Sequence, residues 1–348
     1  MLRIVHVGYA PVSLKSLNQH ATGIKLCNGF IRNGHQVLAL SDRDIARSFG
    51  FGHRRLGRHL FNKMIREYCR AHKPALMVLG HADMLDGTTI AAIREDLPGM
   101  KVVQWNVDPL FEPDNIRRIE GKLDVVDLTL VTTAGPSMAK LRRPGVRVGF
   151  MPNPVDLSIE RGRMDEVETP PFDLFYACGN PDRPKRVICG QPWNMNEFMR
   201  DLAARQPGLR MLTPGLFGQP RVIAAAYQDT LEQAAMGLNI SRRADDFLYS
   251  SDRLAQLAGN GLLAVIERAT GYDRIFGDDE MGFFSSLEEL AEILGRYRAD
   301  PNARMRVARA GRRHYVDLFN ERRVAAYIVD AAFGGTDETA YPWPDHPA

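Results

Sequence analysis

Polar side chains follow three apolar runs in the first half of the chain, at the point where each run ends. Residues 75–79, 100–105 and 128–131 read as buried strands, followed by His81 and Asp83, by Asn106 and Asp108, and by Thr132 and Thr133. The carboxyl ends of parallel strands meet at one sheet edge, where ligands of open α/β sheets bind. A histidine or carboxylate there could act as a general base. We take His81, Asp83 and Asp108 as catalytic candidates, ranking His81 and Asp108 equally; a hydrogen-bonded structural histidine is the alternative for His81.

Cationic side chains follow a glycine at the start of the second half. An apolar run at 172–177 leads into Gly179, and Arg183, Lys185 and Arg186 come next. A glycine-containing loop with three cations after a strand suits the binding of a phosphate group. A basic surface turn is the alternative.

Residues 236–268 have the order strand, loop, helix, glycine turn, strand. Such a segment forms one right-handed crossover of a parallel sheet. The free N–H groups of the helix start, near Arg253, would point at the edge where an anion is held. A cation in the first turn opposes the helix dipole, and a bound phosphate would relieve that conflict. The alternative is a surface ion pair of Arg253 with Asp252 or Asp246.

This segment resembles the donor site of group-1-type glycosyltransferases with the GT-B fold, and is most similar to the CgeB-type spore-maturation glycosyltransferase-like family. That family's pattern is L-N-x-S, then R-x-x-E-x-x-A-x-G, then an apolar strand. The first part is matched by Leu238, Asn239 and Ser241, and the second, more loosely, by Arg253, Ala258 and Gly261. Gln256 stands where the family usually has the glutamate that contacts the donor's ribose.

The resemblance implies an α/β chain of the GT-B class, with two Rossmann-like doubly wound parallel-sheet domains facing each other across a cleft. The expected parts are an acceptor-side domain at 1–155, a nucleotide-sugar-binding domain at 156–320, a helix at 321–333 that crosses back to the first domain, and a mobile tail at 334–348. A length of 348 residues also favours two domains.

The implied activity is transfer of a sugar from a nucleotide-diphosphate sugar to a saccharide, lipid or cell-envelope acceptor, of undetermined stereochemistry. No cofactor and no tightly bound metal are expected, since the nucleotide sugar is a substrate. The diphosphate would be bound by Arg253, Arg183, Lys185 and Arg186 with Gly179, and the nucleoside or sugar by Asn239, Ser241, Gln256 and Glu267. Glu267 could instead cap the next turn, and in a retaining enzyme His81 would only orient the substrate.

Other classes of protein stay open or are disfavoured. A non-catalytic GT-B-like module that binds a sugar or nucleotide is the alternative, and Gln256 favours it. A dinucleotide oxidoreductase would need the motif G-x-G-x-x-G after a strand, and no such motif follows any predicted strand, which disfavours this class. A solute-binding protein would need an export signal, and none is expected here.

Charge and cysteine content indicate the kind of surface that the protein meets and the cellular compartment in which it works. Residues 1–156 hold 22 Lys and Arg against 14 Asp and Glu, a balance of +8, whereas the remainder carries 23 against 28, or −5. A basic first half suits an anionic membrane surface or acidic acceptor, and no nucleic-acid motif accompanies it. Four cysteines without metal-ligand spacing, Cys27, Cys69, Cys178 and Cys189, fit reduced thiols in the cytoplasm.

Residues 53–73 predict a basic helix with Leu56, Leu60, Met64 and Ile65 on its packed face. A solvated basic surface is the preferred interpretation. The more specific alternative is peripheral contact with anionic lipid at the inner membrane face.

The D-x-D of Asp42 and Asp44 could bind a metal ion. We interpret Asp42 instead as the N-cap of a helix that begins near Ile45.

Overall fold

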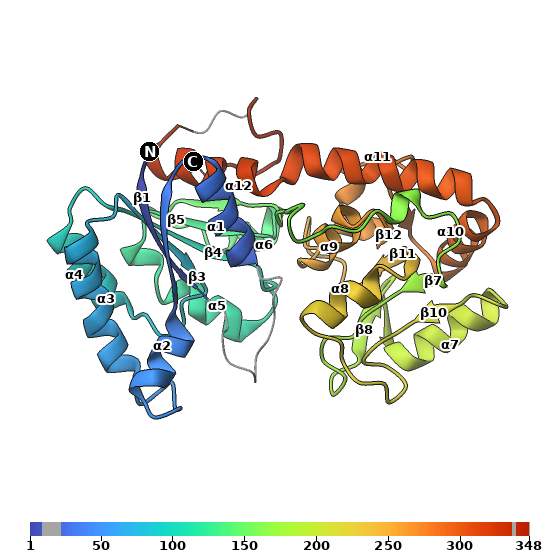
Figure 1. Cartoon of the computed structure of the whole chain (residues 1–348), viewed down its shortest axis with the longest axis horizontal. Coiled ribbons are helices and arrows are strands. Elements are labelled where there is room, and N and C mark those ends of the chain that lie inside the picture. The colour runs from blue at the N-terminus through green and yellow to red at the C-terminus, as the bar shows by residue number, and fades with distance from the viewer. Residues whose placement is uncertain (9–21, 336–338, 348) are drawn as a thin grey trace. The chain divides into compact units, whose positions relative to one another are not determined.

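A computed structural model describes residues 1–8, 22–335 and 339–347 (Figure 1). The chain divides into two compact units, Met1–Pro154 with Asn320–Ala348, and Val155–Phe319. The first unit is left after residue 154 and re-entered after residue 319, whereas the sequence predicts these boundaries after residues 155 and 320. The polar residues Ser16, Asn18, Gln19 and His20, for which the sequence predicts a loop after the first strand, lie outside the described residues.

Unit 1 is built on a parallel sheet of six strands in the order β2-β1-β3-β4-β5-β6. The strands are β1 (Arg3–Gly8), β2 (Gln36–Ser41), β3 (Leu76–Gly80), β4 (Lys101–Asn106), β5 (Leu128–Val131) and β6 (Val148–Phe150). β1, β3, β4 and β5 are buried along almost their whole length, as strands covered by helices on both faces must be. The sheet therefore confirms the predicted Rossmann-like arrangement of unit 1.

The helices of unit 1 pack against this sheet. They are α1 (Thr22–Arg32), α2 (Asp42–Phe49), α3 (Arg58–His72), α4 (Gly87–Asp96), α5 (Pro113–Glu120), α6 (Gly135–Ala139) and α12 (Glu321–Phe333), with the short turn η2 (Leu123–Val125). α1 and α12 touch through their backbones, because a Cβ on Gly29 would lie 2.1 Å from the carbonyl oxygen of Glu321. Arg32 Nη1 also lies 2.6 Å from Glu321 Oε1. The last helix thus belongs to the fold of unit 1.

Helix α3 packs only in part through the face that we expect: Ile65 is buried and Met64 packs half-buried against the core, but Leu56 and Leu60 do not. Its buried side chains are Phe61, Asn62, Ile65 and Cys69, whereas Leu56 and Leu60 are exposed. The helix begins at Arg58 and not at residue 53, so Leu56 precedes it. Leu60 then stands one position away from the buried row at 61, 65 and 69.

The chain end differs from the expected mobile tail, although residues 336–338 and 348 lie outside the described part. Tyr341 and Trp343 are buried, and their rings lie 5.1 and 5.0 Å from the ring of Tyr327 on α12. Asp345 Oδ2 accepts a hydrogen bond from the backbone N–H of Gly135 at 2.6 Å. Two large aromatic side chains cover apolar surface here, and this burial holds residues 339–347 in place.

Unit 2 has a parallel sheet of five strands in the order β10-β7-β11-β12-β13. The strands are β7 (Phe172–Phe175), β10 (Met211–Leu212), β11 (Ala234–Asn239), β12 (Leu263–Glu267) and β13 (Gly282–Phe284). The helices are α7 (Met195–Arg205), α8 (Ala225–Leu231), α9 (Arg253–Gly259), α10 (Leu287–Ala299) and α11 (Pro301–Phe319), with the short turns η3 (Met164–Glu166), η4 (Arg268–Thr270) and η5 (Tyr272–Arg274). The predicted strand–helix–strand crossover is confirmed as β11, α9 and β12, and Gly261, in the predicted glycine turn, has a left-handed φ of 78°.

An antiparallel hairpin lies outside both sheets. It consists of β8 (Lys185–Ile188) and β9 (Gln191–Asn194). Its two-residue turn has positive φ at Cys189 (49°) and Gly190 (75°), as tight hairpin turns require. The predicted cationic loop therefore ends in a hairpin that we did not foresee.

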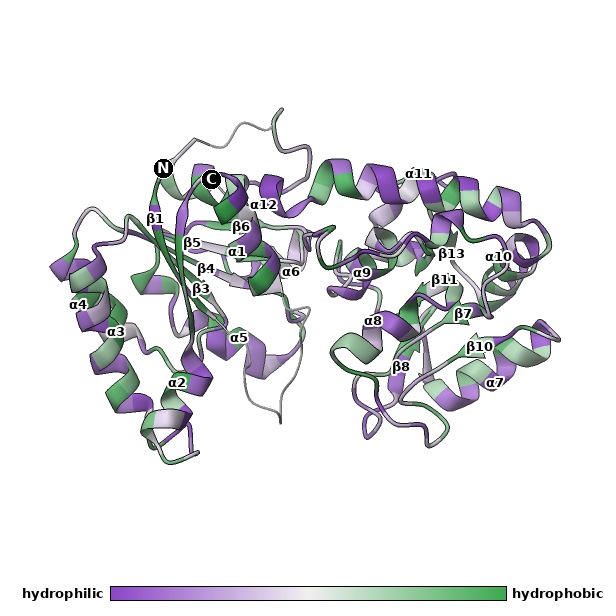
Figure 2. Ribbon diagram, in the orientation of Figure 1, coloured by the Kyte–Doolittle hydropathy of each residue, from purple (hydrophilic) through white to green (hydrophobic). Residues whose placement is uncertain are grey.

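Hydrophobic residues run along the strands of both sheets (Figure 2). None of the described helices combines the length and the apolar character that crossing a membrane requires.

Candidate functional site

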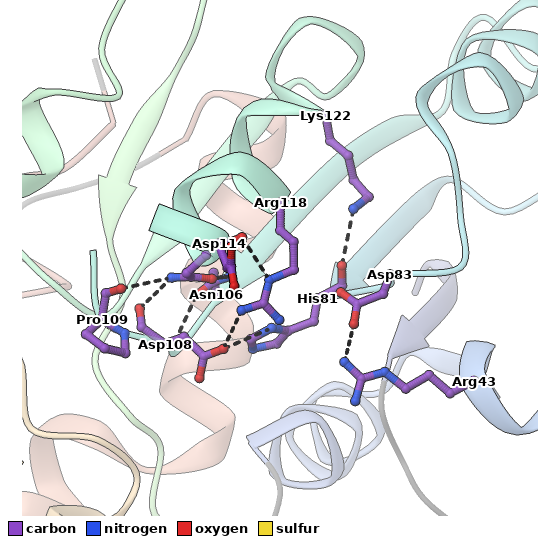
Figure 3. A network of polar contacts seen from close by, with 10 residues as sticks. Arg43, His81, Asp83, Asn106, Asp108, Pro109, Asp114, Arg118 and Lys122 are labelled. Atoms are coloured by element: carbon purple, nitrogen blue, oxygen red, sulfur yellow. Dashed lines mark hydrogen bonds and ion pairs between the residues drawn. The ribbon is translucent and has the colours of Figure 1, made fainter. Parts of the chain in front are cut away.

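The strand ends of unit 1 bring His81 and Asp108 together (Figure 3). His81 follows β3 and Asp108 follows β4, which are neighbours in the sheet. The imidazole Nδ1 of His81 lies 3.7 Å from Asp108 Oδ2, and the same oxygen accepts a hydrogen bond from Arg118 Nη2 at 3.2 Å. The sequence predicts the histidine and the carboxylate, but not Arg118 on helix α5.

The backbone at the end of β3 is strained so that His81 can occupy this place. His81 has φ of 60° and Ala82 has φ of 41°, values that side-chain-bearing residues seldom adopt. The preceding residue must be glycine, because a Cβ on Gly80 would lie 2.2 Å from the indole of Trp105. The ring of His81 meets that indole edge to face, at 5.8 Å between ring centres.

A buried amide network fixes the loop that carries Asp108. Asn106 Oδ1 accepts a hydrogen bond from the backbone N–H of Asp108 at 2.8 Å, and Asn106 Nδ2 donates to Asn115 Oδ1 at 2.7 Å. Asn115 Nδ2 donates to the carbonyl oxygens of Asp108 and Pro109. The predicted rim residue Asn106 is therefore a positioning group.

Burial lowers the pKa of His81 below the ordinary value of 6.5. Desolvation is the largest cause; the charges of Asp108 and Asp83 act in the opposite direction. The imidazole is therefore neutral at pH 7 and can accept a proton.

Asp83 is engaged by another cation. It forms an ion pair with Arg43. Burial acts to raise the pKa of its carboxyl, but Arg43, Arg118 and His81 together lower that pKa below its ordinary value. Lys122 is buried nearby and donates to the carbonyl oxygen of His81 at 3.3 Å. We therefore regard Asp83 as a less suitable base than His81.

Asp42 does not cap helix α2. It is the first residue of the helix and fully buried, and its Oδ2 accepts a hydrogen bond from the backbone N–H of Met84 at 3.0 Å. Ser41 occupies the N-cap position. Asp42 thus fixes the loop after His81 instead of the helix start, and burial raises its pKa. Among the described residues, no three or more His, Cys, Asp or Glu are arranged to hold a metal ion.

In unit 2, three of the four residues expected to bind the nucleoside or sugar line one small recess. Asn239, Ser241 and Glu267 lie around a space of about 10 Å³, with Val187 of the hairpin as a further wall. Asn239 Oδ1 and Ser241 Oγ are buried and have no hydrogen-bond partner within the described part of the chain. Burial raises the pKa of Glu267, partly offset by a hydrogen bond from the backbone of Cys189.

Arg253 lies at the carboxyl ends of two neighbouring strands. Its Nη1 donates to the carbonyl oxygen of Ile240 at 2.8 Å, and its Nη2 donates to that of Ala177 at 3.2 Å. The guanidinium also covers the ring of Tyr176 at 5.2 Å. The alternative ion pair with Asp252 or Asp246 is not formed by Arg253 in the described structure; Asp252 accepts a hydrogen bond from Gln256 Nε2 at 3.0 Å.

The remaining cations of the predicted diphosphate site differ in exposure. Arg183 and Lys185 are exposed, as is Gly179, whose carbonyl oxygen accepts a hydrogen bond from Arg221. Arg186 is buried and donates to the carbonyl oxygens of Arg183 and Lys185, both at 2.8 Å. Arg186 therefore closes the loop, and the two exposed cations are the ones open to a ligand.

The two parallel sheets define a chain of the GT-B class, and solved structures of that class are similar over nearly the whole length. A sucrose-phosphate synthase from Thermosynechococcus elongatus gives a TM-score of 0.63 at 12% identity, covering 97% of this chain and 100% of that one. HepE from Anabaena, in complex with UDP and glucose, gives 0.61 at 12% identity, covering 96% and 100%. AviGT4, a glycosyltransferase involved in avilamycin A biosynthesis, gives 0.59 at 14% identity, covering 96% and 97%.

Sequence comparison adds a family match for part of the chain. Residues 186–330 match the family model described as glycosyl transferase-like, a span that runs from the hairpin of unit 2 into helix α12. No curated protein sequence matches the chain significantly. The matched span contains Asn239, Ser241, Arg253, Gln256 and Glu267.

Proposed function

We propose that the protein is a glycosyltransferase that moves a sugar from a nucleotide-diphosphate sugar to a saccharide, lipid or cell-envelope acceptor. The observation that carries the proposal is the recess of unit 2. It lies within the span that matches the glycosyl transferase-like family, and it presents two buried oxygens, of Asn239 and Ser241, without a partner in the described structure. Buried polar atoms are nearly always hydrogen-bonded, so these two atoms suit one hydroxyl or N–H group of a ligand, which is as much as a space of about 10 Å³ admits.

The donor would be held by side chains of unit 2 without a tightly bound metal. A nucleotide-sugar bond breaks with the diphosphate as leaving group, and the charge that develops on it needs cations or N–H dipoles. Arg253 would supply that charge from the strand ends, where two carbonyl oxygens hold its guanidinium. Arg183 and Lys185 would add charge from the exposed loop. Gln256 would then donate to the ribose only after releasing Asp252.

His81 would act on the acceptor if the reaction inverts the anomeric centre. The acceptor oxygen would bond to the sugar carbon while the bond from that carbon to the diphosphate breaks, and the acceptor's proton would pass to the neutral imidazole. Asp108 would orient the ring and stabilise the imidazolium that forms. In a retaining reaction, His81 would orient the acceptor without taking its proton.

The test is a screen of UDP-, GDP-, ADP- and CMP-sugars by thermal shift, followed by measurement of nucleotide release with saccharide and glycolipid acceptors. We expect a shift with one nucleotide class, and turnover that survives EDTA. A shift without turnover would instead identify a non-catalytic binding module, and no shift with any donor would contradict both functions.

We also propose that the protein works in the cytoplasm. All four cysteines are unpaired thiols, Cys27, Cys69, Cys178 and Cys189, as is usual in a reducing compartment. Measurement of free thiols on protein isolated under alkylating conditions tests this.

A further inference from the structure

Four exposed apolar side chains gather where helix α2 passes into helix α3. Twelve large hydrophobic residues are exposed in the described structure, and four of them fall within residues 49–60: Phe49, Phe51, Leu56 and Leu60. Phe51 is 97% exposed and Leu56 is 71% exposed. In Figure 1 this connection forms the tip of unit 1 beyond the last turn of α2. Single exposed apolar residues are common, but such a group marks a binding surface.

The turn that presents these side chains is well defined. The backbone N–H of Gly52 donates to the carbonyl oxygen of Arg47 at 2.8 Å, and that of Leu56 donates to His53 at 3.1 Å. Gly57 packs so closely that a Cβ would lie 1.8 Å from the carbonyl oxygen of Ala46. Phe51 nevertheless has a φ of 49°, a conformation unfavourable for a phenylalanine. An exposed aromatic side chain in a strained conformation gains nothing for the fold, which indicates a role outside it.

The ionisable residues of the turn itself are all basic, and Asp44, just before it, pairs with Arg47 at 2.6 Å. Residues 45–66 contain six Lys or Arg and two His, and no Asp or Glu. Arg54, Arg55 and Lys63 are exposed, and no carboxylate within the described residues pairs with them. Arg47, Gly52, His53, Arg54 and Arg55 line an open surface hollow of about 370 Å³. Cations around a hollow suit phosphate groups, and apolar side chains beside them suit hydrocarbon.

We propose that the connection between α2 and α3 docks onto an anionic lipid surface, with Phe51, Leu56 and Leu60 entering the headgroup region and Arg54, Arg55 and Lys63 contacting lipid phosphates. Neither set alone identifies a membrane: basic residues bind any polyanion, and apolar residues suit another protein. Together, on one turn without acidic residues, they have the chemistry of a membrane interface. The inference does not depend on the proposed activity, since binding to vesicles needs no donor or acceptor.

Flotation of the full chain with vesicles of phosphatidylcholine alone, or of phosphatidylcholine mixed with anionic phosphatidylglycerol, tests the proposal. The wild-type protein should bind only the anionic vesicles, and less as salt is raised. Each well-placed cation contributes a factor of about five, so Arg54→Glu with Arg55→Glu should lower the partition coefficient by about twentyfold or more. Phe51→Ser with Leu56→Ser should lower it about tenfold at unchanged charge.

Matched controls come from exposed residues elsewhere in the chain. Ile31→Ser removes an exposed apolar side chain from α1, and Arg313→Glu reverses an exposed cation on α11; both should bind like the wild type. Phe51→Gly separates folding from binding, because glycine tolerates the positive φ. It should weaken binding while the melting temperature stays the same or rises.

Two results would overturn the proposal. One is wild-type protein that fails to bind anionic vesicles at low salt. The other is binding that depends on Arg54 and Arg55 but not on Phe51 and Leu56, which would indicate a surface for polyanions in general; competition by heparin that is equal for all variants would support that reading.

Discussion

The imidazole Nδ1 of His81 and the carboxylate Oδ2 of Asp108 lie 3.7 Å apart at the ends of neighbouring strands of unit 1. The separation allows electrostatic attraction, whereas a hydrogen bond would need a slightly closer approach. Arg118 holds the same oxygen, so Asp108 sits between a cation and an imidazole. We expect the distance between His81 Nδ1 and Asp108 Oδ2 to shorten once the imidazole takes a proton, because the two groups then carry opposite charges.

If His81 is the general base, His81→Asn should lower kcat by about 10²- to 10⁴-fold. The melting temperature and the thermal shift with the donor should stay close to those of the wild type. His72→Asn is the control, since His72 lies at the far end of helix α3 and contacts Tyr68. A kcat within threefold of the wild-type value would remove His81 from the proposed mechanism.

The pH profile should report the same group. Burial lowers the pKa of His81, so kcat/KM should fall only at pH values below the ordinary histidine value of 6.5. The charge of Asp108 raises this pKa, and Asp108→Asn should therefore move the fall to lower pH. If the fall of kcat/KM in Asp108→Asn moved to higher pH, the result would contradict the attribution of this fall to His81.

Ser241→Ala should weaken donor binding without loss of stability. The Oγ atom has no partner in the described structure, so its removal breaks no hydrogen bond within the protein. We expect a rise in the KM for the nucleotide sugar of about fivefold, the effect of one neutral hydrogen bond. The control Ser286→Ala should do the reverse, because it removes the cap of α10: about 1 kcal/mol less stable, with donor binding unchanged.

His6 should make the free energy of unfolding depend on pH. This buried histidine accepts a hydrogen bond from the indole N–H of Trp105 at 3.2 Å, and burial lowers its pKa from 6.5 to about 4. In the unfolded chain it takes up a proton below pH 6.5, so stability is lost as pH falls from 6.5 towards 4, by up to about 3 kcal/mol.

Urea unfolding at pH 7 and pH 4.5 checks this prediction. His6→Gln keeps an acceptor for Trp105 and does not titrate, so the difference between the two pH values should shrink. The exposed His59→Gln should leave that difference unchanged. Equal pH dependence in all three proteins would show that His6 is not responsible.

Trp343→Ala should lower the free energy of unfolding of unit 1 by about 3 kcal/mol, because the side chain is buried against Tyr327. Phe333→Ala, at the half-exposed end of α12, should cost less than about 1 kcal/mol. Denaturation followed by circular dichroism measures both. A negligible effect of Trp343→Ala would support the mobile tail that the sequence suggests.

The sequence determined the strands of both parallel sheets and their order, but not the hairpin β8–β9 or the start of α3. Apolar runs that end in polar residues identified the strands and the edge at which His81, Asp83, Asp108, Asn239 and Glu267 lie. That prediction succeeds because burial on both faces demands continuous apolar strands, and because parallel strands place all their carboxyl ends on one side. The positive φ of Gly261 was equally readable, since only glycine adopts it at low cost.

The tertiary structure decided which side chains meet. Arg118, Arg43 and Lys122 contact the candidate base or its neighbours across loops whose lengths carry no signal of the contact. Arg253 binds carbonyl oxygens of other segments and Arg186 binds those of its own loop, although their sequence positions equally suited a phosphate. The exposed face of α3 likewise depends on where the helix begins, and a shift of one residue turns a side chain by about 100° around the helix axis. Side-chain partners depend on the packing of distant segments, and a linear pattern does not encode that packing locally.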